Sequence, residues 1–410
     1  WMMTFSNVAS LVGAGAVVSV VAEGYNSGIS YGIILPLGFI FGAILLAIFG
    51  YKIKEFSAKH DIYTIVEFFE KRFDRKNKIL VGFLQIILLL FWIGIQAVAF
   101  ASLASVLIGF DYIFALILAS VITILYTAIG GLKVDIISDF IQFWIIFIMF
   151  IVIFVIGLGN VGGFENLFSS LPQGHLDVFS FGGIGFFISA TLFSGFLFIA
   201  GTQNWQRIIS AKNKEVARKS FLLSIPFLII ISIFTLFMGL FSSVLLEGIN
   251  KNTAIFSLMQ NILPTALYGI GLASILAVIM SSIDSLLIGG STIISREIFK
   301  KRYVGDKEKL LFARLLTGIF GVVGFLVALI FPDIVNLSIL QGTMALIFPA
   351  AIIAGLYSKR VSSNASFYSI LIPFVLLVIL FPILEKQTLM VTTPFSILIV
   401  IFYDKIFKRK

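Results

Sequence analysis

The chain has 410 residues, of which 60% are hydrophobic and 12% are charged, and its formal net charge is +9. Soluble proteins carry roughly a quarter charged residues, so this composition excludes an ordinary soluble domain. The sequence contains no cysteine, which excludes disulfides, thiolate metal sites and cysteine nucleophiles.

Apolar runs recur from one end of the chain to the other. Many have about 18 residues or more, which is long enough to cross a bilayer as a helix. No polar stretch between them is long enough to fold separately, so we expect one transmembrane domain over residues 1–410. Charged and Gly/Pro-rich breaks divide the chain into about twelve predicted spans. In chain order these are roughly 3–21, 32–51, 79–108, 112–129, 136–158, 180–206, 219–246, 261–295, 310–331, 334–356, 364–384 and 391–406.

The first and sixth spans carry glycines where a helix would be weakened. The first contains Gly13 and Gly15, and the sixth contains Gly195 and Gly201. The two spans are five apart and would cross the membrane in opposite directions, as expected of inverted repeats whose first helices are interrupted at a binding site. Close helix packing through small residues is the alternative explanation.

The connections between spans carry nearly all the basic residues. Of 29 lysines and arginines, all but Lys251 and Lys386 lie in or beside alternate connections, Arg207 among them. Because basic loops stay cytoplasmic, we expect a multi-pass protein of the cell (plasma or inner) membrane with a cytoplasmic C-terminus. The positive charge is then a topology signal, and we expect no nucleic-acid partner. His60 and His175 also fall in connections, where we expect solvated side chains.

Several polar residues remain inside the predicted spans. Asp139 begins the fifth span, and the eighth span carries Ser281, Ser282, Asp284 and Ser285. Hydroxyl, carboxylate and freed carbonyl oxygens form a hard ligand set that suits an alkali cation rather than a soft transition metal. Alternatively, the serines bond to carbonyls one turn earlier and Asp284 pairs with a lysine at the membrane rim.

Three further polar side chains lie in mid-span and are candidates for substrate contact. They are Gln96, Ser194 and Gln341. We place no arginine or lysine in mid-membrane, so a strongly anionic substrate would have no fixed cationic partner, although a helix N-terminus can serve instead. This favours a small neutral or zwitterionic solute.

Four segments of the chain resemble the sodium/solute symporter family. They read "GGLKVDIISDFIQ", "WQRIISAKNKEVARKS", "MSSIDSLLIGGSTIISREIFKK" and "FPAAIIAGLYSKRVSSNAS". The resemblance implies an all-α, LeuT-like 5+5 inverted repeat with about twelve transmembrane helices. Repeat one would cover about 1–158, repeat two about 180–356, and peripheral helices about 364–406. Family members usually have a further helix before the first repeat. The chain opens "WMMTFSNVAS" without a leading methionine, so we expect it to be incomplete at the N-terminus.

The resemblance also implies site residues by position. The main sodium site would use oxygens of Ala9, Val12, Val278, Ser281 and Ser282. A second cation site, for sodium or a proton, would use Asp139, Ser281, Asp284 and Ser285. The substrate site would include Gly13, Gln96, Ser194 and Gln341.

The function implied is sodium-coupled symport, with Na⁺ as the coupling ion and a small molecule as substrate. Two alternatives share the fold: a proton-coupled symporter that titrates Asp139 or Asp284, and a transporter-like sensor. An intramembrane aspartyl protease is disfavoured because "SSID" stands where its "GxGD" motif would be, so we expect no enzyme. Substrate identity, sodium count and oligomeric state are left open.

Overall fold

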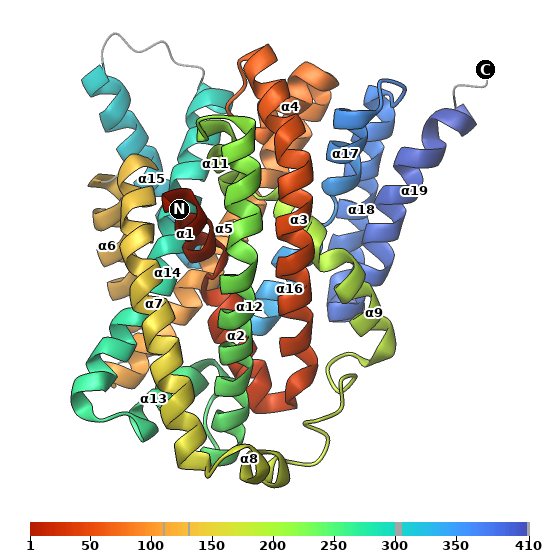
Figure 1. Ribbon diagram of the computed structural model, residues 1–410. Coiled ribbons are helices and arrows are strands. Elements are labelled where there is room, and N and C mark those ends of the chain that lie inside the picture. Colours follow the sequence, from red (N-terminus) through yellow and green to blue (C-terminus); the bar gives the residue numbers. More distant parts are fainter. Residues whose placement is uncertain (110, 130–131, 300–305, 408–410) are drawn as a thin grey trace.

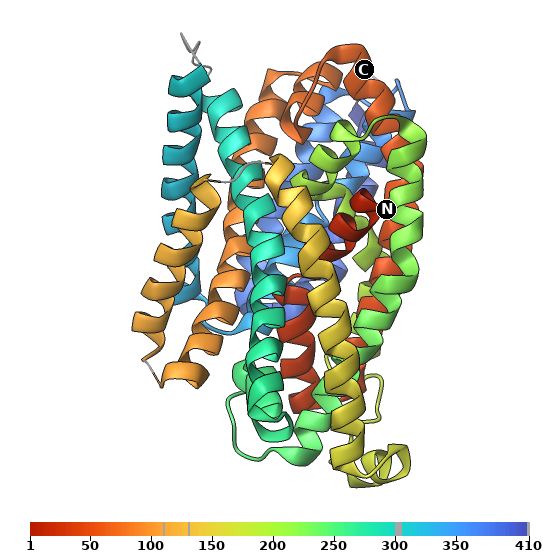
Figure 2. The same ribbon diagram turned by 60° about the vertical axis from the view of Figure 1, so that its left-hand side comes forward.

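The protein is a bundle of long helices, seen from two directions in Figure 1 and Figure 2. The structure is a computed structural model that describes all residues except 110, 130–131, 300–305 and 408–410. Within the described residues, every regular element is helical. This confirms the predicted all-α class.

The first part of the bundle contains the first broken span and four long helices. Its elements are α1 (Met2–Leu11), α2 (Ala14–Ser27), α3 (Ile29–His60), α4 (Ile65–Arg72), α5 (Arg75–Ile108), α6 (Tyr112–Ile129) and α7 (Leu132–Val161). Short α4 lies at the same end of the bundle as the C-terminus (Figure 1).

The second part begins with short α8 at the opposite end of the bundle (Figure 1). Its elements are α8 (Phe164–Ser170), α9 (Gly183–Phe193), η1 (Ser194–Phe196), α10 (Leu197–Ala200), α11 (Thr202–Ser210), α12 (Lys214–Leu245), η2 (Lys251–Thr253), α13 (Ala254–Ile262), α14 (Thr265–Ile293), the π-helical η3 (Ile294–Phe299), α15 (Asp306–Ile330), α16 (Ile334–Ala345), α17 (Pro349–Tyr357), α18 (Ser363–Leu384), η4 (Glu385–Thr388) and α19 (Leu389–Phe407).

The number of membrane spans is not fixed by length and hydropathy alone. Among the described residues, eight helices are long and apolar enough to cross a membrane, or up to nine if the bent pair α1–α2 is one span. That count takes 363–407, with α18 and α19, as one span, and α15 contributes a shorter apolar stretch over Arg314–Ile330. The number of twelve spans stays a prediction.

Three spans are interrupted near the centre of the bundle. α1 and α2 meet at an angle of 46°, and the sixth span is divided into α9, η1, α10 and α11, with its last break at Gly201. These two breaks confirm the positions predicted from the glycines. The third break, between α16 and α17, was not predicted, and Pro349 stands at the first position of α17, where a missing N–H costs nothing.

Small residues let the helices around the first break approach closely. Gly24 of α2 faces Gly239 of α12 so closely that a Cβ on Gly24 would lie 2.9 Å from the Cα of Gly239. Such glycine contacts are typical of helix packing in membranes. Away from this centre, α6 and α15 lie side by side on one flank, and α18 and α19 form another.

The prediction of a solvated His175 was wrong. The segment 171–182 packs on the corner between α2 and α3, where the His175 carbonyl accepts from Ile29 N (2.9 Å) and its Nε2 lies 3.2 Å from the Tyr25 carbonyl. The side chain is therefore buried. Gly28 permits this approach, since it has a φ of 77° and a Cβ there would stand 2.1 Å from the His175 oxygen. His60 is exposed, as expected, at the end of α3.

Candidate functional site

The site is built around the break in the first span. α1 ends at Leu11, and Val12 leaves the helical conformation with φ −87° and ψ 66°. α2 then begins at Ala14, whose backbone N–H donates to Gln96 Oε1 of α5 at 3.1 Å. A side chain from another helix thus binds an amide that a helix start leaves without an internal partner. The backbone at the break is held in place from α5.

Two serines of α14 face the carbonyl end of α1. Ser281 Oγ donates to the Ala9 carbonyl at 2.9 Å and lies 3.1 Å from the Val278 carbonyl. Ser282 Oγ lies 3.3 Å from the Ser10 carbonyl. Both serine side chains are buried. The result is a compact group of carbonyl and hydroxyl oxygens without a formal charge, which is a ligand set for a hard monovalent cation.

Gly13 allows the serines to come this close. A Cβ at Gly13 would stand 2.4 Å from Ser282 Oγ and 3.1 Å from Gln96 Nε2, and the first distance is shorter than real Cβ contacts. The structure therefore brings the sodium-site residues predicted on α14 against those on α1, with Val12 directly after the helix end. Their role as sodium ligands stays a prediction.

A buried ion pair lies beside these oxygens. Asp139 of α7 and Arg207 of α11 are 0% and 2% exposed, with Arg207 Nη2 2.9 Å from Asp139 Oδ2. Ser6 Oγ also donates to Asp139 Oδ2 at 2.7 Å, and Arg207 Nη2 donates to Ser285 Oγ at 3.0 Å. The pair links three helices, α7, α11 and α14, to α1. Removing one partner would leave a buried charge uncompensated, which is strongly unfavourable.

A cavity of about 140 Å³ lies on the α2 side of the break. Gly13 and Gln341 line it, together with the aromatic side chains of Trp92 and Phe198. The Nε2 atom of Gln341 is buried and has no hydrogen-bond partner among the described residues. The same holds for Gln96 Nε2, although Gln96 is not among the residues that line the cavity. Among its described lining residues, none is charged. The cavity can therefore take a small solute that offers hydrogen-bond acceptors.

A model of the sodium:solute symporter family matches residues 1–373. The chain belongs to this family. Its members are transporters rather than enzymes. The sodium/proline symporter of Staphylococcus aureus (strain bovine RF122 / ET3-1) is 26% identical over 65% of this chain and 55% of its own length. The osmoregulated proline transporter OpuE of Bacillus subtilis (strain 168) is 26% identical over 74% of this chain and 65% of its own length. This family member thus matches little more than half the length of the first relative.

Solved structures of other transporters share the fold. A Na⁺-coupled sialic acid symporter in a substrate-bound, outward-open state has a TM-score of 0.81 at 19% identity, covering 99% of this chain and 90% of that one. MhsT in complex with L-phenylalanine has a TM-score of 0.61 at 15% identity, covering 98% of this chain and 97% of that one. These likenesses confirm the LeuT-like inverted-repeat fold of this symporter-family chain.

Two predicted substrate residues of this symporter-family chain, Gln96 and Ser194, are not among the residues that line the cavity. Gln96 instead accepts the Ala14 N–H with its Oε1. Ser194 begins the turn η1 and packs against α3, where a Cβ on Gly38 would lie 2.8 Å from its hydroxyl oxygen. The residues of this span that do line the cavity, Leu197 and Phe198, follow in α10.

The buried position of Arg207 differs from its prediction beside a connection. α11 extends to Ser210, so Arg207 lies within the helix, and its side chain turns inward to Asp139. Arg207 precedes a run of basic residues, so its local sequence does not distinguish it from a solvated arginine. Arg207 contacts two members of the second predicted cation site, Asp139 and Ser285.

Proposed function

We propose that the protein is a sodium-coupled secondary active symporter that imports a small neutral or zwitterionic solute by alternating access. The observation that carries the proposal is the contact between Ser281 Oγ and the Ala9 carbonyl, which joins α14 to the broken end of α1. Sodium fits this uncharged oxygen set because it needs a few hard ligands and no large countercharge.

Coupling follows from residues shared by the cation group and the cavity. Ser10 and Gly13 lie at the break, Ser282 of α14 faces it, and all three line the cavity. A sodium ion between α1 and α14 holds these three residues in the arrangement that accepts the solute. The bound solute in turn raises the affinity for sodium by the factor by which sodium raises the affinity for the solute. The membrane potential contributes about 2.3 kcal/mol per 100 mV for each sodium that enters.

The second predicted cation site holds an arginine in this conformation. Asp139, Ser281, Asp284 and Ser285 were its predicted members, and the guanidinium of Arg207 bonds to Asp139 and Ser285. One carboxylate at Asp139 balances one cation in a buried site. A second sodium ion, or a transported proton, would use Asp139 only after Arg207 moves away.

The substrate class follows from the cavity. Its amide donor at Gln341 suits a carboxylate or carbonyl oxygen. The start of α2, beside Gly13 of the lining, adds the partial positive charge of a helix N-terminus. The apolar faces of Trp92 and Phe198 suit a small hydrocarbon body. Because the two curated relatives are named for proline, L-proline is the first substrate to test.

The chain's arrangement in the cell membrane belongs to the same proposal. The C-terminus and α4 lie at one end of the bundle (Figure 1), where the sequence places nearly all basic residues. That end faces the cytoplasm by the positive-inside rule. The two repeats cover about 1–158 and 180–356, and the helices over about 364–406 are peripheral.

Thermal stability of the purified protein in sodium or potassium chloride tests the cation site. We expect sodium, and not potassium, to raise the melting temperature, and the variant Ser281→Ala/Ser282→Ala to lose this response. Ser274→Ala is the matched control, since Ser274 is a buried serine of the same helix that bonds to the Gly271 carbonyl. L-proline uptake into vesicles should then require an inward sodium gradient. Absence of any sodium response would overturn the proposal, and uptake driven by a pH gradient alone would favour proton coupling.

A further inference from the structure

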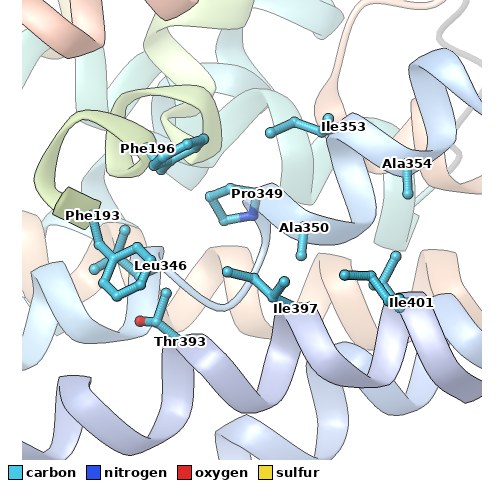
Figure 3. A pocket seen from close by; sticks show the side chains of 11 residues that line it. Phe193, Phe196, Leu346, Pro349, Ala350, Ile353, Ala354, Thr393, Ile397 and Ile401 are labelled. Atoms are coloured by element: carbon cyan, nitrogen blue, oxygen red, sulfur yellow. The ribbon is translucent and has the colours of Figure 1, made fainter. Parts of the chain in front are cut away.

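A second cavity of about 270 Å³ lies between the sixth, tenth and last spans. Figure 3 shows it lined by Phe193 and Phe196 from α9 and η1, by Pro349 and Ala350 at the start of α17, and by Ile397 of α19. We call this space the outer pocket. None of these residues belongs to the group of oxygens between α1 and α14. None of them lines the cavity beside the first break, which we call the solute cavity.

The outer pocket suits an apolar occupant. Among its lining residues in the described part of the chain, only Thr393 has a polar side chain. An engineered cavity of about 150 Å³ with apolar walls stays dry and binds benzene, so a larger pocket with such walls excludes water in favour of hydrocarbon. A charged or strongly polar ligand would lose its hydration here without compensation.

The surroundings of the outer pocket identify that occupant. Its rim on α19 includes Ile397 and Ile401, which are 36% and 48% exposed, and Leu192 of the neighbouring α9 is 61% exposed. In a chain that spans a membrane, such apolar side chains face lipid. The pocket is thus continuous with the lipid-facing surface. We propose that the outer pocket binds one acyl chain of a membrane glycerolipid.

Thr393 supplies a contact for the oxygen end of that chain. Its side chain is 4% exposed, and its Oγ1 has no hydrogen-bond partner among the described residues. Thr393 is the fifth residue after the end of η4, which carries Glu385 and Lys386, so it lies about 8 Å along α19 from this charged turn at 1.5 Å per residue. A buried hydroxyl without a partner is unfavourable in apolar surroundings. An ester carbonyl of the bound lipid can accept this hydroxyl proton.

Occupancy of the outer pocket bears on the solute cavity, because the two spaces share a wall. Phe196 lines the outer pocket and the next residue, Leu197, lines the solute cavity. In the tenth span, Gly342 lines the cavity and Leu346, one turn later, lines the pocket. An acyl chain would hold both broken segments in place. This second step rests on the proposed transport function, whereas lipid binding does not.

Photolabelling tests the binding step. The wild-type protein is reconstituted in phosphatidylcholine vesicles that contain a phosphatidylcholine with a diazirine within one acyl chain, and labelled peptides are mapped by mass spectrometry after irradiation. We expect labelling of 193–196 and 346–354 to exceed that of the outward face of α19 several-fold. Ala350→Trp, which fills the pocket, should remove the excess. Leu398→Trp should not, since Leu398 lies on α19, outside the pocket, and is 48% exposed. Ile397→Trp fills the pocket from the other wall if Ala350→Trp does not fold.

Equal labelling at the pocket and the outward face, or labelling unchanged by both filling variants, would overturn the site. The shared wall is tested separately through the sodium concentration that gives half of the maximal thermal stabilisation. A several-fold change in Ala350→Trp, without one in Leu398→Trp, is expected, and no change would overturn the coupling. If wild type shows no sodium response while pocket labelling persists, the transport function fails and the lipid site stands.

Discussion

Replacing Gly13 with alanine should disable the sodium site without disturbing the backbone. Gly13 has φ −88° and ψ −176°, an extended conformation that alanine adopts freely. The effect of the added methyl group is therefore steric. It would stand 2.4 Å from Ser282 Oγ, where ordinary contacts begin at 3.4 Å, so the hydroxyl has to retreat by about 1 Å or rotate away. Either movement takes an oxygen out of the group facing α1.

The magnitude follows from the cost of crowding. Overpacking by one methyl group typically costs about 1–3 kcal/mol, and because about 1.4 kcal/mol is a factor of ten, sodium should bind roughly 5- to 150-fold more weakly. The assay is sodium-dependent thermal stabilisation, titrated to obtain the half-maximal concentration. Sodium-driven uptake of L-proline should fall in parallel.

Gly342→Ala is the matched control for this prediction. Gly342 lines the same cavity, and a Cβ there would meet nothing within 4 Å. Its sodium response should equal that of wild type. A Gly13→Ala protein with unchanged sodium affinity would refute the argument that Ser282 must lie against the first break for the cation to bind.

Three further predictions concern stability, measured as the free energy of unfolding. Arg207→Met should lower the free energy of unfolding by about 3–5 kcal/mol, because it leaves the buried Asp139 carboxylate without its cation. The double variant Arg207→Met/Asp139→Asn should recover much of this loss. Equal stability of the single and the double variant would contradict the prediction. Lys251→Met removes the 2.7 Å ion pair with Asp333 and should cost about 1 kcal/mol or less. Salt screens this pair, so the difference from wild type should shrink at high salt. A loss of stability that salt leaves unchanged would argue against the ion pair. Asp74→Ala removes the N-cap of α5 and should cost about 1 kcal/mol, while Asp74→Asn keeps most of it. Although burial raises the pKa of Asp74, hydrogen bonds from the first turn of α5 outweigh it and lower that pKa. The charged cap therefore stabilises the fold above the ordinary value of 3.8 and loses this contribution as pH falls below it; a cost of Asp74→Ala that is equally large at low pH would refute it.

Local sequence signals predicted the features that depend on one segment. Glycine weakens a helix wherever it stands, so breaks at Gly13 and Gly201 could be predicted without knowing which other segment packs there. Polar groups in an apolar span need partners, which drew attention to Ser281, Ser282, Asp284 and Ser285. The choice of Ser281 and Ser282 as sodium ligands came from the resemblance to the symporter family. The α16–α17 break had a comparable signal in Pro349, which we did not use.

Features that depend on two distant segments could not be predicted in this way. Arg207 next to a basic connection has the same local pattern as a solvated arginine, and only the folded arrangement of the helices brings its side chain to Asp139 of α7. Likewise, His175 is buried because the segment 171–182 folds back on the α2–α3 corner. A single sequence shows that a buried polar side chain needs a partner, but it does not identify the residue that supplies it.

The segment 171–182 joins the two proposed repeats, and it is fastened to the first of them. Ser30 Oγ donates to the Val178 carbonyl at 2.7 Å and accepts from Phe181 N at 3.2 Å. Directly after Phe181 come Gly182 and Gly183, with φ values of 88° and 76°. Glycine crosses this region of backbone conformations without steric cost. As the second repeat moves, the segment 171–182 should stay bound to the α2–α3 corner while α9 pivots at Gly182 and Gly183.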